Sequence, residues 1–211
     1  MGSHFPKAGN QIRNGEYNLN TYLHIHMAGK GLTMYTILTD SCSDLSRQIT
    51  SEFDHLEVLP LFYTISGVTS NEQFDSEERG TAFYDRLRAG ENCTTSQIPP
   101  AEFFDVFKKY AQKGEAVLGL IFSSALSGTY ASACVAREMV LEEIPDARIE
   151  LIDTLAASAG EGLIVYDALV NRKAGMSLED NAAWIRGRLQ SYAHWFTVDD
   201  LHFLKRGGRC S

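Results

Sequence analysis

The stretch AVLGLIFSSALSGT, residues 116–129, decides the fold of this chain. Its first part, Ala116 to Phe122, is an uninterrupted apolar run of strand length, which is typical of a strand buried on both faces of a parallel sheet. Hydroxyl side chains and a glycine follow at once, and a helical pattern runs from Gly128 to Glu143. The stretch therefore predicts a strand, a polar turn and a helix, which is the repeating unit of an α/β fold.

The same alternation of apolar runs and helical patterns extends in both directions along the chain. Residues 56–65 predict a strand pair or one strand bent around Pro60, and further strands are expected at 34–39, 149–152 and 194–198. Helices are expected at 43–53 with Ser43 as N-cap, from Ser76 to 87, from Pro99 and Pro100 onward, and at 128–143, 156–172 and 177–189. We therefore expect a parallel sheet with helices on both faces, whose ligand lies beyond the carboxyl ends of the strands.

Composition excludes several classes of protein. Of 211 residues, 44% are hydrophobic and 22% charged, as in an ordinary globular chain, and the net charge of −8 does not suit a nucleic-acid partner. No apolar run approaches the roughly 18 residues that a stable membrane span requires, and none makes a signal peptide. The cysteines at 42, 93, 134 and 210 are widely spaced, so we expect reduced thiols in a cytoplasmic protein and neither a metal nor a cofactor.

Three polar clusters follow predicted strands or open predicted helices: residues 39–44 (TDSCSD), 94–97 (TTSQ) and 123–129 (SSALSGT). Hydroxyls and free backbone N–H groups at helix starts can bind an anion without Lys or Arg. Ser and Thr at such positions also serve as plain N-caps and turn formers, and this alternative stays open for each cluster. Together the clusters predict an anion site at one edge of the sheet, without identifying the anion.

Five motifs in order give the chain a specific resemblance. ILTDSCSDLS (37–46), TTSQIPP (94–100), SSALSGTYASA (123–133), IELIDTLAASAGEGL (149–163) and DDLHFLKRGGR (199–209) resemble the motifs of the DegV family. The resemblance implies a non-enzymatic protein that binds a long-chain fatty acid in a buried tunnel and presents its carboxylate to a partner kinase, which forms an acyl phosphate. It also implies an α/β ligand-binding domain at 34–160 and the beginning of an incomplete second domain at 161–211. Residues 1–33, polar and rich in Asn and Gly, are expected to be a tag or disordered extension.

The resemblance also assigns site residues. It implies that Thr95 and Ser127 bind the carboxylate, with Ser96, Ser124, Gly128 and Thr129 as neighbours. Tunnel or nearby positions are Asp40, Ser41, Phe62, Leu126, Ser158 and Gly160, and Arg206 and Arg209 are expected to face the kinase. Further candidates for an apolar channel, each of which could equally be a core residue, are Leu59, Ile65, Phe103, Phe122, Leu155, Leu163 and Phe196. The chain departs from the family pattern at Ile98, where the usual proline is missing, although Pro99 and Pro100 follow.

A serine-dependent hydrolase or esterase of lipid substrates is the competing class. Ser127 would be its nucleophile, but ALSGT is not the GxSxG sequence of a nucleophile elbow, and no histidine is placed to suggest a triad. Bound fatty acid in a solvent extract would favour lipid binding, whereas a clean extract with esterase turnover would favour the hydrolase.

Overall fold

A computed structural model describes residues 35–71, 77–195, 197–198, 200–206 and 208, with only the backbone described at 77–79, 202–203 and 206. The expected tag or extension at 1–33 lies outside the described residues, as do Phe196 and Arg209. Among the described residues, no helix is long and apolar enough to cross a membrane.

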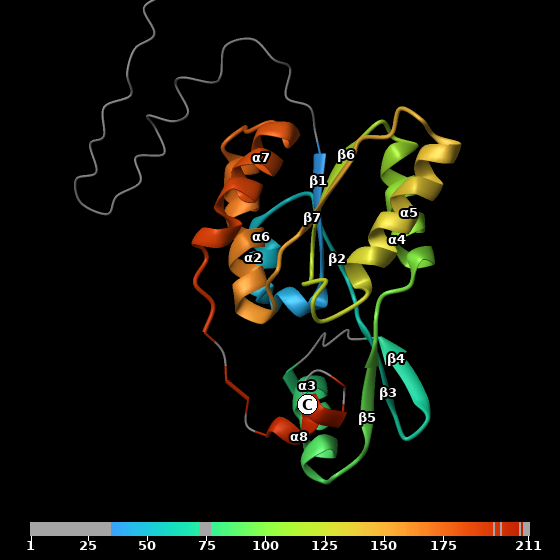
Figure 1. Ribbon diagram of the computed structural model, residues 1–211, viewed down its shortest axis with the longest axis vertical. Helices are drawn as coiled ribbons and strands as arrows, with labels where there is room; N and C mark the ends of the chain where they lie inside the picture. Colours follow the sequence, from blue (N-terminus) through green and yellow to red (C-terminus); the bar gives the residue numbers. More distant parts are fainter. Residues whose placement is uncertain (1–34, 72–76, 196, 199, 207, 209–211) are drawn as a thin grey trace, which may run out of the picture. The chain divides into compact units, whose positions relative to one another are not determined.

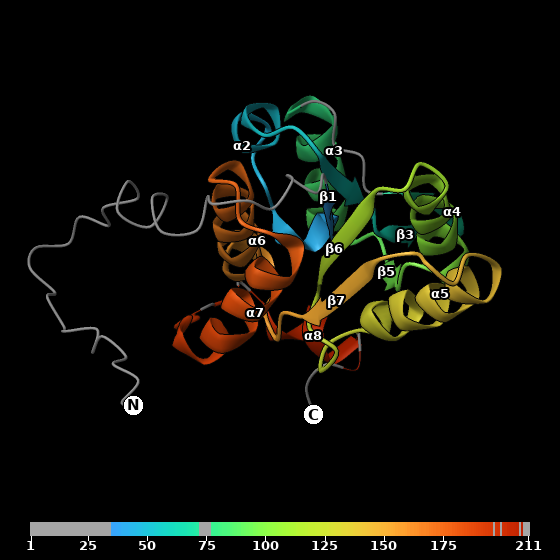
Figure 2. The same ribbon diagram turned by 90° about the horizontal axis from the view of Figure 1, so that it is seen from above.

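The larger sheet is parallel, as the sequence predicts. Its four strands lie in the order β2 (Leu56–Leu59), β1 (Tyr35–Asp40), β6 (Ala116–Ile121) and β7 (Ile149–Asp153), and all three pairings are parallel. Helices α4 (Pro100–Ala111) and α5 (Thr129–Glu143) cover one face, and α6 (Ser158–Lys173) and α7 (Leu178–Arg188) cover the other (Figure 1). Viewed from above, the two helical layers again lie on opposite sides of the strands (Figure 2). This arrangement confirms the expected α/β class.

The central strands β1 and β6 divide their side chains between two cores. Every residue of both strands is buried, which explains the uninterrupted apolar sequence of β6, whereas β1 also buries Thr36, Thr39 and Asp40. Ile37 and Leu118 belong to the core shared with α6 and α7, whereas Leu38 and Val117 belong to the core shared with α4 and α5. Successive strand residues point to opposite faces, so a strand between two helical layers has no face directed toward solvent.

A second, smaller sheet is antiparallel, with strand order β4 (Val68–Asn71), β3 (Phe62–Ile65) and β5 (Cys93–Ser96). Helix α3 (Glu77–Arg88) lies between β4 and β5 in the chain. Ser66 and Gly67, both with positive φ (53° and 79°), form the two-residue turn between β3 and β4, as a type I′ hairpin requires. The strand pair expected at 56–65 is therefore divided between two sheets, and β4 and β5 were not predicted.

The helix expected at 43–53 begins later than predicted. A short 3₁₀ turn, η1 (Ser41–Ser43), follows β1, and α2 runs from Arg47 to Glu52 with Ser46 as its N-cap. The Ser43 hydroxyl donates instead to the Asp40 carbonyl at 2.7 Å, and Asp44 is left-handed with φ of 49°. The prediction that Ser43 is the N-cap was thus wrong, because its hydroxyl closes the turn that follows β1.

The end of the described chain differs from expectation in one element. Residues 194–195 and 197–198 form no strand, and Trp195 is 96% exposed. A 3₁₀ turn, η2 (Leu189–Ser191), precedes this segment and α8 (Leu201–Arg206) follows it. The described residues lie in one compact unit. The domain boundary expected between 160 and 161 falls inside α6, whose buried face packs on the parallel sheet.

Candidate functional site

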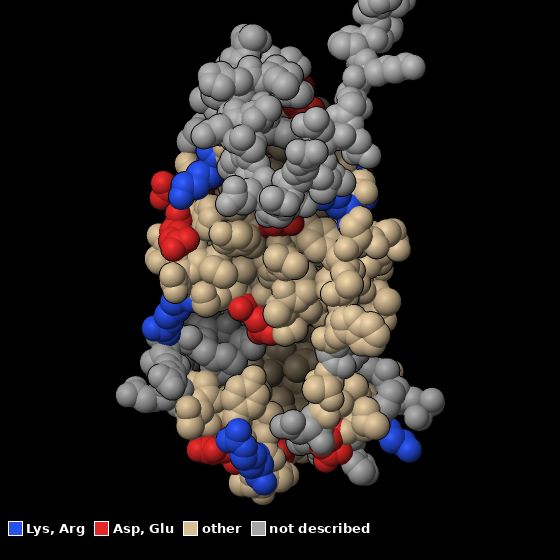
Figure 3. All heavy atoms as spheres, turned by 90° about the vertical axis from the view of Figure 1, so that its left-hand side faces the viewer, with Lys and Arg blue, Asp and Glu red and all other residues tan. Residues whose placement is uncertain are grey.

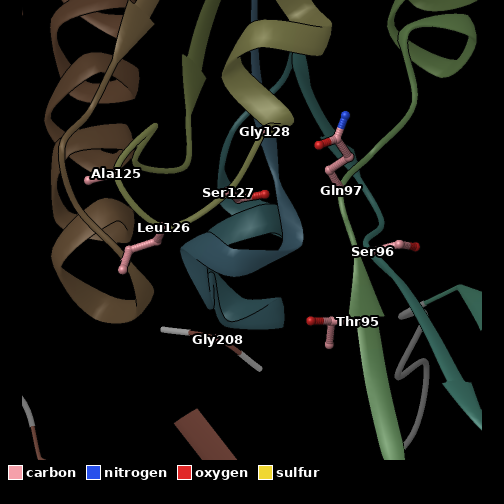
Figure 4. Close-up of a pocket in the computed structure, with 8 residues that line it drawn as sticks. All are labelled: Thr95, Ser96, Gln97, Ala125, Leu126, Ser127, Gly128 and Gly208. Carbon is pink, nitrogen blue, oxygen red and sulfur yellow. The ribbon is translucent and has the colours of Figure 1, made fainter. Parts of the chain in front are cut away.

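Eight residues from three segments line a pocket of about 550 Å³ (Figure 4). We call Thr95, Ser96 and Gln97 the β5 wall, because they lie at the end of β5. Ala125, Leu126, Ser127 and Gly128 form the α5 wall, which leads into α5, and Gly208 also lines the pocket. The volume is within the usual range of small-molecule sites.

Backbone hydrogen bonds to β7 and its following loop fix the α5 wall. The N–H of Ser123 donates to the Ala156 carbonyl at 3.0 Å, and the N–H of Ser124 donates to Asp153 Oδ1 at 3.1 Å. The N–H of Ser127 then donates to the Ser123 carbonyl at 3.2 Å, which closes the turn. The loop between β6 and α5 therefore has a defined conformation without any ligand.

The Ser127 hydroxyl is held by the first residue of α5. Its Oγ lies 2.9 Å from Thr129 Oγ1 and accepts from the Thr129 N–H at 3.3 Å. Thr129 Oγ1 in turn accepts from the Ile98 N–H at 3.4 Å, so the segment after β5 is tied to the start of α5. Thr129 and Ile98 are completely buried, whereas Ser127 is partly exposed and lines the pocket.

The β5 wall is more open. Thr95 and Ser96 are exposed, and neither hydroxyl makes a hydrogen bond to a described residue. Gln97 Nε2 donates to Ser132 Oγ at 2.9 Å. A Cβ added to Gly128 would lie 1.9 Å from Gln97 Oε1, so the absence of a side chain at Gly128 permits this close approach of the walls.

The pocket offers hydrogen bonds without charged side chains. None of its eight lining residues is ionisable at neutral pH, and Gly128 is the N-cap of the 15-residue helix α5. Free N–H groups and the helix dipole favour negative charge at this position. Hydroxyl and amide donors around a helix N-terminus form a site that can bind a carboxylate.

Four of the six expected carboxylate residues line this pocket: Thr95, Ser96, Ser127 and Gly128. Thr129 lies behind Ser127, and the backbone N–H of Ser124 is bonded to Asp153 rather than directed into the pocket. The expectation that the three polar clusters share one edge of a single sheet was wrong, because residues 94–96 belong to the antiparallel sheet.

The cluster at 39–44 has a structural arrangement of its own. Asp40 is fully buried, accepts from the Cys42 N–H at 3.0 Å and from the Phe122 N–H at 3.0 Å, and so joins the ends of β1 and β6. Ser41 Oγ accepts from the Leu61 N–H at 2.9 Å. Neither residue lines the pocket, although both fix loops at the carboxyl edge of the parallel sheet.

The remaining expected positions are dispersed. Of the tunnel candidates, Leu126 lines the pocket, and Phe62 pairs with Ser96 across β3 and β5. Ser158 donates its hydroxyl to Asp44, and a Cβ on Gly160 would lie 2.2 Å from His194 Nδ1. Arg206 ends α8, where its side chain is not described, and Arg209 lies outside the described residues.

None of the additional apolar candidates that the structure describes lines the pocket. Leu59 and Phe103 are buried in the core beneath α4 and α5. Leu155 and Leu163 are 52% and 51% exposed. The face of the molecule that carries α6 shows few charged side chains (Figure 3). Phe196 lies outside the described residues. The pocket is therefore lined mainly by polar residues and glycine, with Leu126 as its large apolar lining residue.

A pair of buried carboxyl groups lies beneath the edge of the parallel sheet. Glu161 is fully buried, and its Oε1 accepts from the Thr39 hydroxyl at 3.3 Å, while Oε2 has no partner among the described residues. Burial, followed by repulsion from Asp40, raises the pKa of Glu161 to about 10. Burial also raises the pKa of Asp40, against the hydrogen bonds from Phe122 and Cys42. Glu161 is therefore neutral at pH 7.

Sequence reasoning missed Gln97, Ala125 and Gly208 as pocket residues. Gln97 and Ala125 lie inside motifs already quoted, so their position beside Ser96 and Leu126 was an available signal. Gly208 also lies inside a quoted motif, residues 199–209, but its place beside residues so distant in the chain depends on tertiary structure.

The arrangement around Ser127 does not resemble that of a serine hydrolase. Its Oγ makes hydrogen bonds to Thr129, and no described histidine lies within hydrogen-bonding distance. A nucleophilic serine needs an adjacent base to accept its proton. The described residues therefore supply a hydrogen-bonding group at this position rather than an activated nucleophile.

The fold and the pocket define an α/β protein with a neutral, hydroxyl-lined site where a strand of its parallel sheet meets a helix N-terminus. The model of the DegV family matches residues 34–211, and the chain belongs to this family. A DegV domain-containing protein of Clostridium perfringens is 42% identical over 177 residues, which are 84% of this chain and 60% of the relative.

Solved structures of similar proteins share the fold. A stearic-acid-binding protein from Eubacterium ventriosum superposes with a TM-score of 0.73 at 27% identity, covering 83% of this chain and 60% of that protein. A DegV family protein from Thermus thermophilus, described as binding fatty acid, has a TM-score of 0.70 at 35% identity, with 83% and 60% covered. The chain thus spans about 60% of the length of these relatives.

Proposed function

We propose that this chain binds a long-chain fatty acid and presents its carboxylate to a partner kinase. The carboxylate would lie between the two walls of the pocket, with Thr95 and Ser127 as its principal hydrogen-bond donors. Ser96 and the backbone at Gly128 would complete the set. The observation that carries this proposal is the neutral, hydroxyl-lined pocket at the N-terminus of α5.

The chemistry of the pocket suits a carboxylate that must stay reactive. A carboxylate removed from water without partners is costly, so several donors are required. Hydroxyl and N–H donors meet this requirement, whereas a bidentate arginine would hold the carboxylate oxygens more tightly. Neutral donors therefore allow one carboxylate oxygen to attack the γ-phosphorus of ATP, with ADP as the leaving group and an acyl phosphate as the product.

Relatives of the chain support the ligand class. The Eubacterium ventriosum protein binds stearic acid, and the Thermus thermophilus protein binds fatty acid. Burial of each CH₂ group contributes about 0.8 kcal/mol, so an apolar tunnel would supply most of the affinity. Leu126 would begin this tunnel at the α5 wall, and Phe62, next to Ser96 in the small sheet, would lie near it.

The kinase would approach the positively charged segment near Gly208. Lys205 and Arg206 lie in α8, and Arg209 follows in the sequence. In a chain with a net charge of −8, this cluster offers complementarity to an acidic surface or to nucleotide phosphates. We expect the binding protein to act in the cytoplasm, where ATP is available.

Lipid extraction tests the ligand. The purified chain is denatured and extracted with organic solvent, and the extract is analysed by mass spectrometry. We expect one long-chain fatty acid per protein, and much less from a Thr95→Val/Ser127→Ala double variant. Equal amounts of acid from the two proteins would contradict the placement of the carboxylate, and a lipid-free extract with esterase turnover would overturn lipid binding.

A second assay tests the kinase step separately. The chain loaded with fatty acid is mixed with ATP and a bacterial fatty acid kinase subunit, and hydroxylamine traps any acyl phosphate as a hydroxamate. We expect product only when both proteins are present. Retained lipid without any hydroxamate would refute presentation to a kinase while leaving fatty acid binding intact.

A further inference from the structure

The hydroxyl of Thr129 lies outside the pocket, yet it contacts the pocket's most constrained donor. Thr129 is completely buried at the first turn of α5. Its Oγ1 lies 2.9 Å from Ser127 Oγ and 3.4 Å from the Ile98 nitrogen. No other hydrogen bond joins the Thr129 side chain to a described residue, so these two contacts determine where its hydrogen points.

The direction of each hydrogen bond follows from counting donors and acceptors. The buried Ile98 N–H can only donate, so Thr129 Oγ1 accepts from it. If Ser127 also donated to Thr129, the Thr129 hydrogen would be buried without an acceptor among the described residues. A buried donor without a partner is strongly disfavoured. Thr129 therefore donates to Ser127.

Ser127 is then fixed as a donor toward the pocket. Its Oγ accepts from the Thr129 hydroxyl and from the Thr129 N–H, which occupies both acceptor positions of a hydroxyl oxygen. Its own hydrogen remains available, and Figure 4 shows the Ser127 oxygen directed toward the space between the two walls. Thr95 and Ser96 have no such constraint, because their hydroxyls make no hydrogen bond to a described residue.

We infer that Thr129 determines head-group specificity by fixing Ser127 as a hydrogen-bond donor, so that the pocket selects a ligand with an acceptor-only head group. This inference rests on the proposed function and deepens it. An ionised carboxylate only accepts hydrogen bonds, an alcohol can donate or accept, and an ammonium group only donates. The affinity for ligands of equal chain length should therefore fall in the order carboxylate, alcohol, ammonium. Thr129 should act on this order as a positioning residue, because it orients the Ser127 hydroxyl.

The test compares Thr129→Val, which keeps the shape and removes the hydroxyl, with Thr129→Ser, which keeps the hydroxyl. Dissociation constants of the delipidated full chain are measured for myristate, myristyl alcohol and myristylammonium. We expect the acid-to-alcohol preference to fall about five- to tenfold in Thr129→Val, as the loss of one oriented hydrogen bond implies. It should stay within about twofold of wild type in Thr129→Ser, since its hydroxyl can make the same hydrogen bond.

Thr129→Val leaves the buried Ile98 N–H without its acceptor, which should reduce the stability of the fold. The ratio of the dissociation constants for acid and alcohol, both measured on the same variant, is insensitive to such a loss. An unchanged acid-to-alcohol ratio in Thr129→Val, with all ligands weakened equally, would overturn the inference and leave fatty acid binding in place. Failure of the wild-type chain to bind myristate would instead overturn the proposed function, and the inference with it.

Discussion

The two walls of the pocket differ in how they are held. On the α5 wall, the loop backbone is bonded to β7 and to the loop that follows it, and Ser127 makes two contacts with Thr129. On the β5 wall, Thr95 and Ser96 are exposed and their hydroxyls make no hydrogen bond to described residues. One wall is thus preorganised, and the other must be ordered by the ligand, at about 0.5–1.5 kcal/mol for each immobilised side chain.

This difference has a consequence for mutations. Changes on the α5 wall should alter both the stability of the fold and the affinity for ligand, because the same hydrogen bonds serve both. Changes of Thr95 or Ser96 on the β5 wall should alter affinity alone. The parallel sheet that carries the α5 wall should in turn be the least tolerant part of the described chain.

The largest effect is expected from Gly162→Ala, which tests how tightly the parallel-sheet side is packed. The new Cβ would lie 2.3 Å from the Ser43 carbonyl oxygen, a backbone atom that cannot move without shifting η1 or α6. We expect a loss of about 3 kcal/mol in the free energy of unfolding, measured by urea denaturation.

Gly187→Ala is the matched control, because no atom lies within 4 Å of its added Cβ and its position is in helix α7. It should be neutral or should stabilise the chain by up to about 1 kcal/mol. Equal changes in the free energy of unfolding for the two substitutions would show that a side chain at position 162 fits between α6 and η1.

Glu161→Gln should change how stability depends on pH. The native pKa of about 10 lies above the ordinary value of 4.5, so the folded chain keeps a proton that the unfolded chain loses. Stability therefore falls as pH rises between these two values, by up to about 1.4 kcal/mol per pH unit. Urea denaturation at pH 6, 7 and 8 should show a shallower fall in Glu161→Gln.

Glu57→Gln provides the control for that measurement. Burial of Glu57 opposes ionisation, but hydrogen bonds from Tyr110 and Lys109 lower its pKa below the ordinary value. Its contribution to stability is present at neutral pH and is lost in acid, so it should not alter the slope between pH 6 and 8. A steep slope that survives in Glu161→Gln would contradict a neutral Glu161.

Ser127→Ala should affect both properties of the α5 wall. It leaves the buried Thr129 hydroxyl without its acceptor, which should reduce the free energy of unfolding by about 1–2 kcal/mol. It also removes a donor from the pocket, so the dissociation constant for myristate should rise. If Ser127→Ala lost affinity for myristate at an unchanged free energy of unfolding, the α5 wall would not differ from the β5 wall in this respect.

Thr95→Val should give the smallest effect on stability. Valine keeps the branched shape that suits β5, and the exposed Thr95 hydroxyl has no described partner to lose. We expect the free energy of unfolding to stay within about 0.5 kcal/mol of wild type, while the dissociation constant for myristate rises about fivefold. Denaturation and ligand titration of the same preparation measure both.

The parallel sheet was predictable because its residues carry a strong local signal. A run such as 116–122 has no polar face, and this alone indicates a strand covered on both sides. The polar turn and the helix were predictable because hydroxyl residues and a helical pattern follow this run directly. The helix was expected from Gly128 and begins at Thr129, with Gly128 as its N-cap and Ser127 in the loop before it.

The small sheet was not predictable from local sequence. Strand β5 reads Cys-Thr-Thr-Ser, whose hydroxyls resemble a turn or cap, and it becomes a strand by pairing with β3. Residues 194–195 and 197–198 show the opposite case, because they were expected in a strand from their aromatic and apolar sequence but pair with no described strand. Sequence therefore singled out the hydroxyl residues that line the pocket, but not Gln97, and not that the two walls follow strands of different sheets.

The order of strands also constrains how the chain can fold during synthesis. Strand β1 pairs with β6, and the whole antiparallel sheet with α3 and α4 lies between them in the chain. Neighbouring strands β3 and β4 can form their hairpin early, whereas β1 must wait for β6 to leave the ribosome and must close a long loop to meet it. The antiparallel sheet, whose hairpin can form early from local contacts, is thus inserted in the chain between two strands of the parallel sheet, which forms late from long-range contacts. The pocket can form only when both sheets are complete.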